Sequence, residues 1–281
     1  MISLIRIFYA PFFFIGFISA AVWLVGSDLP VLTLLALLLG AVIISLLAER
    51  IAPYEPIWNR DHNDRTRDVI HALVNEASIV GMLLLLPLMA LLTPWTSVWP
   101  QSWPFWAQLA LAILLLDIGI TLVHYVSHRI NWLWRFHAVH HSVERMYGFN
   151  GLLKHPVHQT LEISGGAIPW IILGIPFEIA ALAGFAASIQ LLLQHSNVDM
   201  RIGPLKFVWA VAPVHRHHHI ASASKGDVNF GLFLTLWDVL LGTANFAKSD
   251  SVKSGSIGIE DAPDYPTAYL PQLIQPFRNR L

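Results

Sequence analysis

Long apolar runs separated by short polar links dominate the first half of the chain. Four runs approach the length of roughly 20 residues that a helix needs to cross about 30 Å of hydrocarbon; they occupy residues 8–26, 31–48, 77–93 and 106–126. The first run follows Arg6, as a signal-peptide core would, but it is too long for such a core and further spans follow it. The pattern predicts four transmembrane helices, the first of them retained.

A further apolar region, 163–193, differs from these runs because Pro169, Gly174 and Pro176 interrupt it. Two half-length helices that enter and leave one face of the membrane would fit these breaks, and so would two additional short spans. We expect the first arrangement, a re-entrant or short helical hairpin.

The distribution of basic residues predicts the orientation. The link at 49–76 contains four arginines, whereas the links at 27–30 and 94–105 contain neither Lys nor Arg. Because cytoplasmic loops carry the excess of basic residues, the N-terminus, the 49–76 link and everything after residue 127 are expected in the cytoplasm. Four tryptophans between residues 95 and 106 are typical of the opposite membrane interface.

Composition agrees with a membrane protein and excludes several kinds of site. Of the 281 residues, 55% are hydrophobic and only 12% are charged, and the mean hydropathy is +0.57; soluble domains carry about 25% charged residues. A net charge of −1 gives no basis for binding nucleic acid. Cysteine is absent, so disulfides, thiolate metal sites and cysteine nucleophiles are excluded.

Histidine is the unusual residue, because 12 of the 14 histidines lie between His124 and His219. Eight of them form three boxes with HxxxH or HxxHH spacing: HYVSH at 124–128, HAVHH at 137–141 and HRHHH at 215–219, where His217 is an additional member. Positions three and four apart share one face of a helix, so each box can direct two or three imidazoles to one point. Eight imidazoles suffice for two metal ions, and imidazole suits iron, zinc, copper and nickel. Satisfied core histidines would explain one isolated histidine better than three such boxes.

The surroundings of the boxes are also specific: LWRFHAVHHS at 133–142, LKHPVHQTLE at 153–162, LLQHSN at 192–197, and the NFG, WD and GT elements that close the segment 215–243. With these motifs the chain resembles bacterial-type members of the membrane fatty acid hydroxylase/sterol desaturase superfamily, over about half its length. The resemblance implies an all-α integral membrane protein, in which about four membrane helices support a cytosolic helical cap that holds a non-haem di-iron centre. The implied reaction is O2-dependent hydroxylation or desaturation of a lipid at an unactivated C–H position.

The resemblance also implies the metal ligands. The eight box histidines match the family's ligand positions: His124, His128, His137, His140, His141, His215, His218 and His219. His195, in LLQHSN, is expected as a ninth ligand. His155, in a Lys-His-Pro element, is either a tenth ligand or a neighbour of one.

Other residues near the boxes are expected to support or surround the site. Asp117 lies two turns before His124 on the fourth span, and a carboxylate inside hydrocarbon is by default a functional candidate. It could order a hydrogen-bond chain through Thr121 to His124, since ligating imidazoles usually donate their second N–H, or it could line a polar gap between helices. Asn229 and Asp238 are further candidates for orienting imidazoles.

The remaining histidines and two acidic residues are expected to play lesser parts. We expect neighbours of the site at His158 and His217, and surface positions at His62, His71, Glu144 and Glu162.

The domain organisation and the partners follow from these assignments. Residues 1–110 are expected to form N-terminal membrane helices with an Arg-rich cytosolic loop, 111–247 the histidine-box domain, and 248–281 a polar cytosolic tail. The chain has no GxGxxG fingerprint and no room for a flavin or haem domain, so an external electron donor, a reductase or a ferredoxin-like protein, is expected. The lipid would enter from the membrane, and the C-terminal sequence favours a bacterial inner membrane.

Two other functions are possible for a histidine-rich membrane protein. A zinc-dependent membrane hydrolase would activate water, but the HExxH arrangement is absent and the histidines exceed the three protein ligands of a typical catalytic zinc. A metal transporter would place its ligands near mid-bilayer, but the first three predicted spans contain no His, Asp or Glu.

Overall fold

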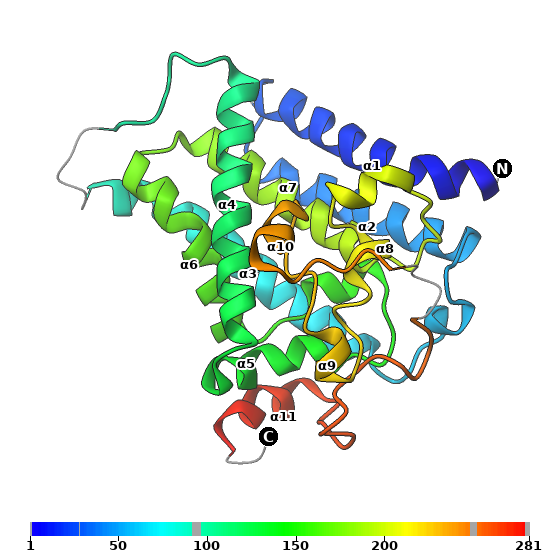
Figure 1. Ribbon diagram of the computed structural model, residues 1–281. Helices are drawn as coiled ribbons and strands as arrows, with labels where there is room; N and C mark the ends of the chain where they lie inside the picture. The colour runs from blue at the N-terminus through cyan, green and yellow to red at the C-terminus, as the bar shows by residue number, and fades with distance from the viewer. Residues whose placement is uncertain (1, 28, 92–96, 248–251, 279–281) are drawn as a thin grey trace.

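Helices and short connecting segments make up the described chain. The computed structural model describes residues 2–27, 29–91, 97–247 and 252–278, and within these ranges extended pairing is limited to three isolated β-bridges. Among the described residues, five helices are long and apolar enough to cross a membrane: α1 (Ile2–Val25), α2 (Thr33–Ile51), α3 (Arg65–Leu91), α4 (Phe105–Ser127) and α7 (Phe177–His195). In Figure 1, α4 stands almost upright and α1 runs from the N-terminus toward its upper end. The predicted all-α membrane fold is confirmed.

Where it is described, each of the four predicted spans is helical over most of its length. Residues 92 and 93 of the third run lie outside the described residues, and the third helix begins well before its apolar run. α3 starts at Arg65, and its first turns carry the polar residues Asp68, His71 and Asn75, all of which are buried. The side-chain amide of Asn75 donates to the carbonyl oxygen of Leu152, 2.7 Å away. The first turns of α3 therefore precede its apolar segment and lie in a polar interior. A search for apolar runs does not detect these turns.

The interrupted apolar region forms two helices of 18 and 19 residues, and not the half-length pair expected for a re-entrant hairpin. It consists of α6 (Pro156–Leu173) and α7, and the turn between them contains Gly174, with a left-handed φ of +70°, and Pro176. α7 is the most enclosed long helix, with 89% of its span residues buried, because α1, α2, α3 and α4 all pack against it. Since α7 is also long enough to cross, the candidate spans number five, one more than predicted.

A close contact between glycines joins α4 to α6. A Cβ atom on Gly119 of α4 would lie 2.2 Å from the carbonyl oxygen of Gly165, and one on Gly166 would lie 2.4 Å from a methyl group of Leu116. Helices approach closely in membranes where small residues face each other. This contact places the last turn of α4, which carries the first histidine box, beside α6.

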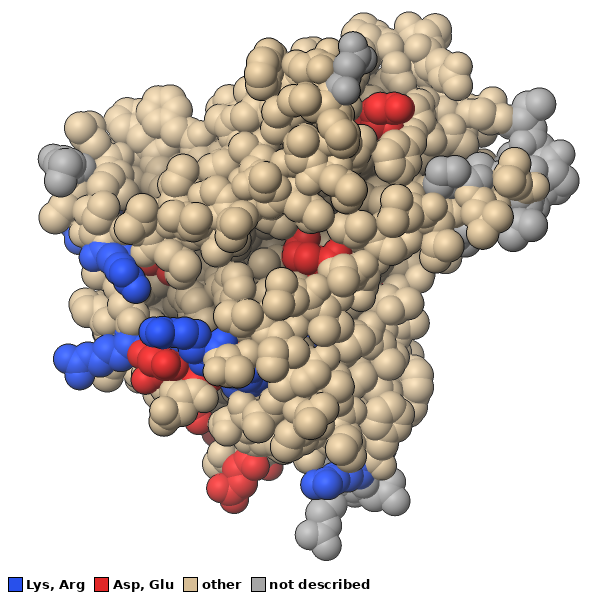
Figure 2. All heavy atoms as spheres, turned by 180° about the vertical axis from the view of Figure 1, so that it is seen from behind, with Lys and Arg blue, Asp and Glu red and all other residues tan. Residues whose placement is uncertain are grey.

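Short helices connect and flank the long ones, and we refer to them together as the cap. They are η1 (Pro56–Asn59), α5 (Asn131–His141), η2 (Gly148–Leu152), η3 (Gly203–Phe207), α8 (Ala212–His215), α9 (Ala223–Gly226), α10 (Leu236–Leu241), α11 (Tyr269–Ile274) and η5 (Gln275–Phe277). On the face shown in Figure 2, most charged side chains gather toward the left edge and the lower end, and much of the remaining surface is uncharged. Such a distribution is typical of a bundle in lipid with a polar cap in water.

A buried ion pair attaches the link between α2 and α3 to the cap, and a second lies within α3. Arg145 donates to both carboxylate oxygens of Asp64, at 2.7–3.1 Å, and Arg67 lies 2.7 Å from Asp68. Burial acts to raise the pKa of Asp64, but the hydrogen bonds and charge of Arg145 outweigh burial and lower this pKa below its usual value. Part of the predicted Arg-rich loop is therefore internal.

The C-terminal segment is packed against the cap and is not a separate appendage. Its described part, 252–278, buries Val252 and Ile257 against Trp58 and packs Tyr265 against Val139. The polar composition of the segment suggested a solvated tail, but several of its apolar side chains are buried against the cap.

Candidate metal centre

Nine of the ten predicted ligand histidines gather in two adjoining clusters. The first contains His124, His128, His137, His141 and His218, and the second contains His140, His195, His215 and His219. Within each cluster the candidate ligand nitrogens all lie within 4.8 Å of one another. The side chains come from the C-terminal ends of α4 and α7, from α5, and from α8 with the turn that follows it.

The boxes and the clusters do not correspond one to one. On α5, His137 and His141 are one turn apart and belong to the five-histidine cluster, whereas His140 points to the four-histidine cluster. The third box is divided in the same way, since His218 belongs to the first cluster and His215 to the second. Two elements therefore contribute to both clusters, which ties the two positions into one centre.

The Nε2 atoms of the histidines converge. In the five-histidine cluster, Nε2 of His218 lies 2.8 Å from Nε2 of His124 and 2.9 Å from Nε2 of His141. In the four-histidine cluster, Nε2 of His195 lies 3.1 Å from Nε2 of His140. Two nitrogens bound at about 2.1 Å to one ion, at right angles to each other, would be about 3 Å apart.

For five of the nine histidines, the opposite nitrogen contacts a main-chain carbonyl, which fixes the position of the proton. Nδ1 of His124 lies 2.9 Å from the carbonyl oxygen of Phe230, and Nδ1 of His218 lies 2.8 Å from that of Val228. A carbonyl only accepts, so Nδ1 carries the hydrogen and Nε2 presents a lone pair. The same contact is made by His140 with Leu153, His195 with Leu191 and His215 with Asn229.

This donor set fits bound metal ions. Lone pairs that face each other at about 3 Å repel unless a cation lies between them. Burial first, and neighbouring imidazoles second, lower the pKa of His141 and of His219 well below the usual value. The imidazoles are thus neutral, which is the form that binds a metal.

His155 stands apart from both clusters. Its Nδ1 accepts a hydrogen bond from the backbone N–H of Val157 and caps α6, and its Nε2 lies 3.2 Å from the carbonyl oxygen of Leu273. Both nitrogens are therefore used within the protein. The proline that follows His155 is the signal for this role, because Pro favours the first position of a helix.

Among the histidines that were not expected to be ligands, one lies where it was predicted and another does not. His158 lies beside the five-histidine cluster, within a third potential group with His137 and Glu162. The expectation that His71 is a surface residue is wrong: it is fully buried, and its ring nitrogens lie 3.0 Å from the carbonyl oxygen of Lys154 and 2.9 Å from Oε1 of Gln272.

Asp117 reaches the histidines indirectly. It accepts hydrogen bonds from the backbone N–H groups of Phe233 and Leu234 and from the indole of Trp237, at 2.7–3.1 Å. Thr121 donates to Asp117, at 3.4 Å, as expected for the predicted chain. However, the chain continues from Thr121 to the backbone of residue 232 and not to a histidine.

Asn229 and Asp238 act on the same segment, residues 228–237. Asp238 accepts from the backbone N–H groups of Phe230 and Gly231, at 2.7 and 2.9 Å. Asn229 adopts a positive φ of 56°, and its side-chain amide donates to the carbonyl oxygen of Val214. The carbonyls of this segment accept from three cluster histidines, so both side chains hold the stretch of main chain that these imidazoles contact.

Two acidic residues next to the clusters were not identified from the sequence. Glu162, expected at the surface, is buried and pairs with Lys154, beside a small space of about 10 Å³ that His140 and His195 also line. Its spacing of four residues from His158 on α6 was the available signal. Asp227 lies 3.1 Å from Nδ1 of His128, and its position in a loop gives no comparable signal.

Comparison with known proteins agrees with this geometry. Five candidate spans and two converging histidine clusters define a membrane protein of the histidine-box class. The family model described as fatty acid hydroxylase matches residues 109–243, and the chain belongs to this family.

Among curated relatives, the chain is 32% identical to the ornithine lipid hydroxylase of Rhizobium tropici over 272 residues, which cover 94% of this chain and 81% of the relative. It is 32% identical to an alkylglycerol monooxygenase of Danio rerio, over 64% of this chain and 39% of that protein. It is 26% identical to a very-long-chain aldehyde decarbonylase of Oryza sativa, over 58% and 28%. No solved structure matches. The family and these relatives support the predicted class, an oxygen-dependent lipid oxidoreductase of a membrane.

Proposed function

We propose that the two histidine clusters bind two iron ions, and that the protein hydroxylates a lipid with O2 and two electrons from an external reductase or ferredoxin-like donor. The observation that carries the proposal is the convergence of neutral imidazoles, which present Nε2 lone pairs inward while Nδ1 donates to the main chain. Iron would supply the activation of O2 that no side chain provides. Desaturation is the alternative outcome of the same hydrogen abstraction.

The protein's own contribution is to hold and enclose the ligands. Main-chain carbonyls keep five of the nine imidazole rings in one orientation and one tautomer. The buried Lys154–Glu162 pair lies beside His140 without adding net charge. His128 completes its contacts through Asp227, so its Nε2, which has no hydrogen-bond partner, is directed to the ligand position.

The similarity to an ornithine lipid hydroxylase makes an ornithine lipid the first substrate to test, since that likeness covers most of both chains. We place the protein in a bacterial inner membrane with the clusters facing the cytoplasm. The bacterial relative and the basic residues of the 49–76 link support this proposal.

Metal analysis of the purified protein tests the proposal. We expect about two iron ions per chain and substrate-dependent O2 uptake. His124→Ala, His137→Ala, His140→Ala or His218→Ala should each remove activity and at least one ion, and His195→Ala should lower metal content. His62→Ala is the control and should retain both ions. Zinc as the sole metal without O2 uptake would favour a hydrolase, and wild-type turnover in two of the four variants would refute the shared centre.

Lipid mass spectrometry tests the reaction. Extracts from cells with and without the gene should differ by a lipid whose mass is increased by 16 Da, the mass of one added oxygen atom. A decrease by 2 Da would identify desaturation instead.

A further inference from the structure

The metal centre has one side that faces water. A cavity of about 390 Å³ lies against His128, His141 and His218 of the five-histidine cluster, whereas the four-histidine cluster adjoins the space of about 10 Å³ described above. Four charged side chains also line the larger cavity: Arg129, Asp227, Glu260 and Asp261. Because charged groups are costly in hydrocarbon, a cavity with this lining belongs on the aqueous side.

Two other stretches of the cap, residues 203–210 and 230–241, are almost entirely apolar. They contain η3 and α10 and pair with each other, since the backbone N–H of Ala210 donates to the carbonyl oxygen of Phe233, at 2.8 Å. Their only charged residues are Lys206 and Asp238. The second stretch begins at the centre, because the carbonyl oxygen of Phe230 contacts Nδ1 of a cluster histidine.

These stretches expose large apolar side chains. Six of them are between 47% and 69% exposed, and we call them the η3–α10 surface: Leu205, Phe207, Val208, Leu236, Val239 and Leu240. The three on α10 are spaced three and four residues apart and share one face of the helix, while Asp238 of the same helix is fully buried. Apolar side chains gathered in this way mark a contact with lipid or with another protein.

Contacts with α4 place α10 at the depth of the hydrocarbon. The carboxylate of Asp117 accepts hydrogen bonds from the backbone N–H of Phe233 and from the indole of Trp237, at 2.8 and 2.7 Å. Asp117 precedes Ser127, the last residue of α4, by ten residues, which is about 15 Å at the rise of an α-helix. This length is about half the thickness of the hydrocarbon core. α10 therefore lies beside the middle of a candidate span (Figure 1).

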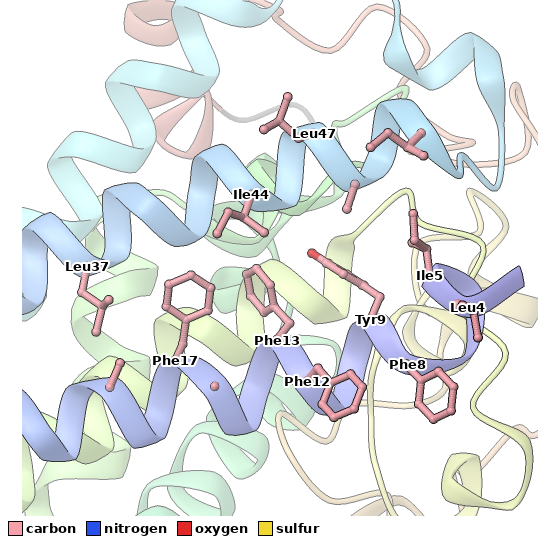
Figure 3. A pocket seen from close by; sticks show the side chains of 14 residues that line it. Leu4, Ile5, Phe8, Tyr9, Phe12, Phe13, Phe17, Leu37, Ile44 and Leu47 are labelled. Atoms are coloured by element: carbon pink, nitrogen blue, oxygen red, sulfur yellow. The ribbon is translucent and has the colours of Figure 1, made fainter. Parts of the chain in front are cut away.

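Contacts with α1 give the same depth. The ring of Phe14, at the middle of α1, lies 5.6 Å from the ring of Trp209 and 6.2 Å from that of Phe233. Elsewhere α1 is suited to lipid as well, since it forms with α2 an apolar groove of about 750 Å³, into which Phe13 and Phe17 point (Figure 3). The two stretches thus contact the middles of two candidate spans.

Much of the backbone of the two stretches is hydrogen-bonded inside the protein, as hydrocarbon requires. The side-chain amides of Gln190 and Gln194, on α7, donate to the carbonyl oxygen of Leu232, at 2.8 and 3.2 Å. The ammonium group of Lys206 donates to the carbonyl oxygen of Phe246, at 2.8 Å. A segment exposed to water would not need these partners, because water would supply them.

We propose that the η3–α10 surface is embedded in the hydrocarbon of the leaflet next to the clusters, where it contacts lipid acyl chains. Residues 203–210 and 230–241 then form a re-entrant element between α1 and α4. The expected orientation instead kept both stretches in the cytoplasm. This placement concerns depth and not chemistry, so it goes beyond the proposed function and does not rest on it.

Single-cysteine variants of the full-length protein test this depth without background, because the chain contains no cysteine. Phe207→Cys and Val239→Cys are labelled with an environment-sensitive fluorophore and placed in nanodiscs whose lipids carry nitroxides on their acyl chains. We expect quenching at both positions to match that of Leu114→Cys, an exposed position of α4. Lys225→Cys, exposed on α9, is the water-facing control and should lose little fluorescence. All four side chains are exposed, so the fold should be unchanged, which circular dichroism checks.

A membrane-impermeant maleimide gives a second readout in nanodiscs without nitroxides. It should modify Lys225→Cys and leave Phe207→Cys and Val239→Cys unmodified. Reaction at all three positions at one rate, without quenching, would place the surface in water and overturn the inference. Protection without quenching would indicate a protein partner such as a second copy of the chain, and quenching at only one of the two positions would exclude a shared surface; both would also overturn it. The proposed function is judged separately, by iron content and O2 uptake.

Discussion

Asp117 shows how one buried carboxylate stabilises the site from a distance. Asp117→Leu would leave the backbone donors of Phe233 and Leu234 and the indole donor of Trp237 unpaired. Each unpaired buried donor costs about 1–3 kcal/mol, so we expect the free energy of unfolding to fall by about 3 kcal/mol or more. Asp117→Asn should cost less, because its amide oxygen still accepts.

Denaturation of both variants in detergent, with metal analysis alongside, measures these effects. Metal content should follow stability, since Phe233 lies close in sequence to the carbonyls that orient the imidazoles. A Leu variant as stable as the wild type would show that Asp117 only fills a gap between helices.

At the residue scale, the sequence predicts ligands better than it predicts their arrangement. The i, i+3 and i+4 spacing within each box identifies which imidazoles share a helix face. It does not show that His140 leaves the cluster of its neighbour His141, because that depends on where α7 places His195. Nor does it predict the hydrogen-bond partners of the imidazoles, such as the carbonyl oxygen of Phe230. Every residue has a main-chain carbonyl, so the sequence does not show which one a histidine contacts.

At the scale of elements, the close contact of α4 with α6 is possible because Gly119 has no side chain. Gly119→Ala would place Cβ 2.2 Å from the carbonyl oxygen of Gly165, and relief requires the helices to separate. Overpacking of this kind costs about 1–3 kcal/mol. Because α4 carries His124 and ends directly before His128, we also expect reduced metal content.

Gly81→Ala is the matched control for this change. Gly81 lies within α3, and a Cβ atom there meets nothing within 4 Å. Alanine is the better helix former by about 1 kcal/mol, so this variant should be as stable as the wild type or more stable. Thermal unfolding followed by circular dichroism separates the two; equal behaviour would mean that α4 and α6 adjust freely.

Apolar runs predict helices well where helices face lipid. The four predicted spans are present for this reason. The same criterion misses the first turns of α3, whose polar residues are satisfied inside the cap. It also underestimates α7, because a helix enclosed by four neighbours does not need the unbroken apolar surface of a lipid-facing span.

At the scale of the whole molecule, the attachment of the cap predicts a response to acid. The pKa of Asp64 is lowered by Arg145, against the effect of burial. A carboxylate with a lowered pKa in the folded state contributes stability that is fully present above its unfolded pKa and is lost as pH falls through the folded value. The melting temperature of the wild type should therefore drop as the pH falls below about 4. The Asp64→Asn variant should have a lower melting temperature at neutral pH and a smaller drop in acid. An identical pH profile in the variant would exclude this ion pair as the cause.

The C-terminal segment shows that composition alone does not predict how a segment packs in the whole molecule. Its polar residues suggested a solvated tail, yet Gln272 reaches His71 and Ser142 in the interior. These contacts join residues more than 100 positions apart, so no local sequence pattern predicts them.

The unequal access to the two clusters has a kinetic consequence. An ion held by the four-histidine cluster exchanges with solvent only after the cap opens, whereas one held by the five-histidine cluster faces the cavity of about 390 Å³. A chelator should therefore remove the two ions in separate phases, with a half-occupied species accumulating between them. Refilling that species with a different metal would give a mixed-metal protein in which each position can be observed by itself.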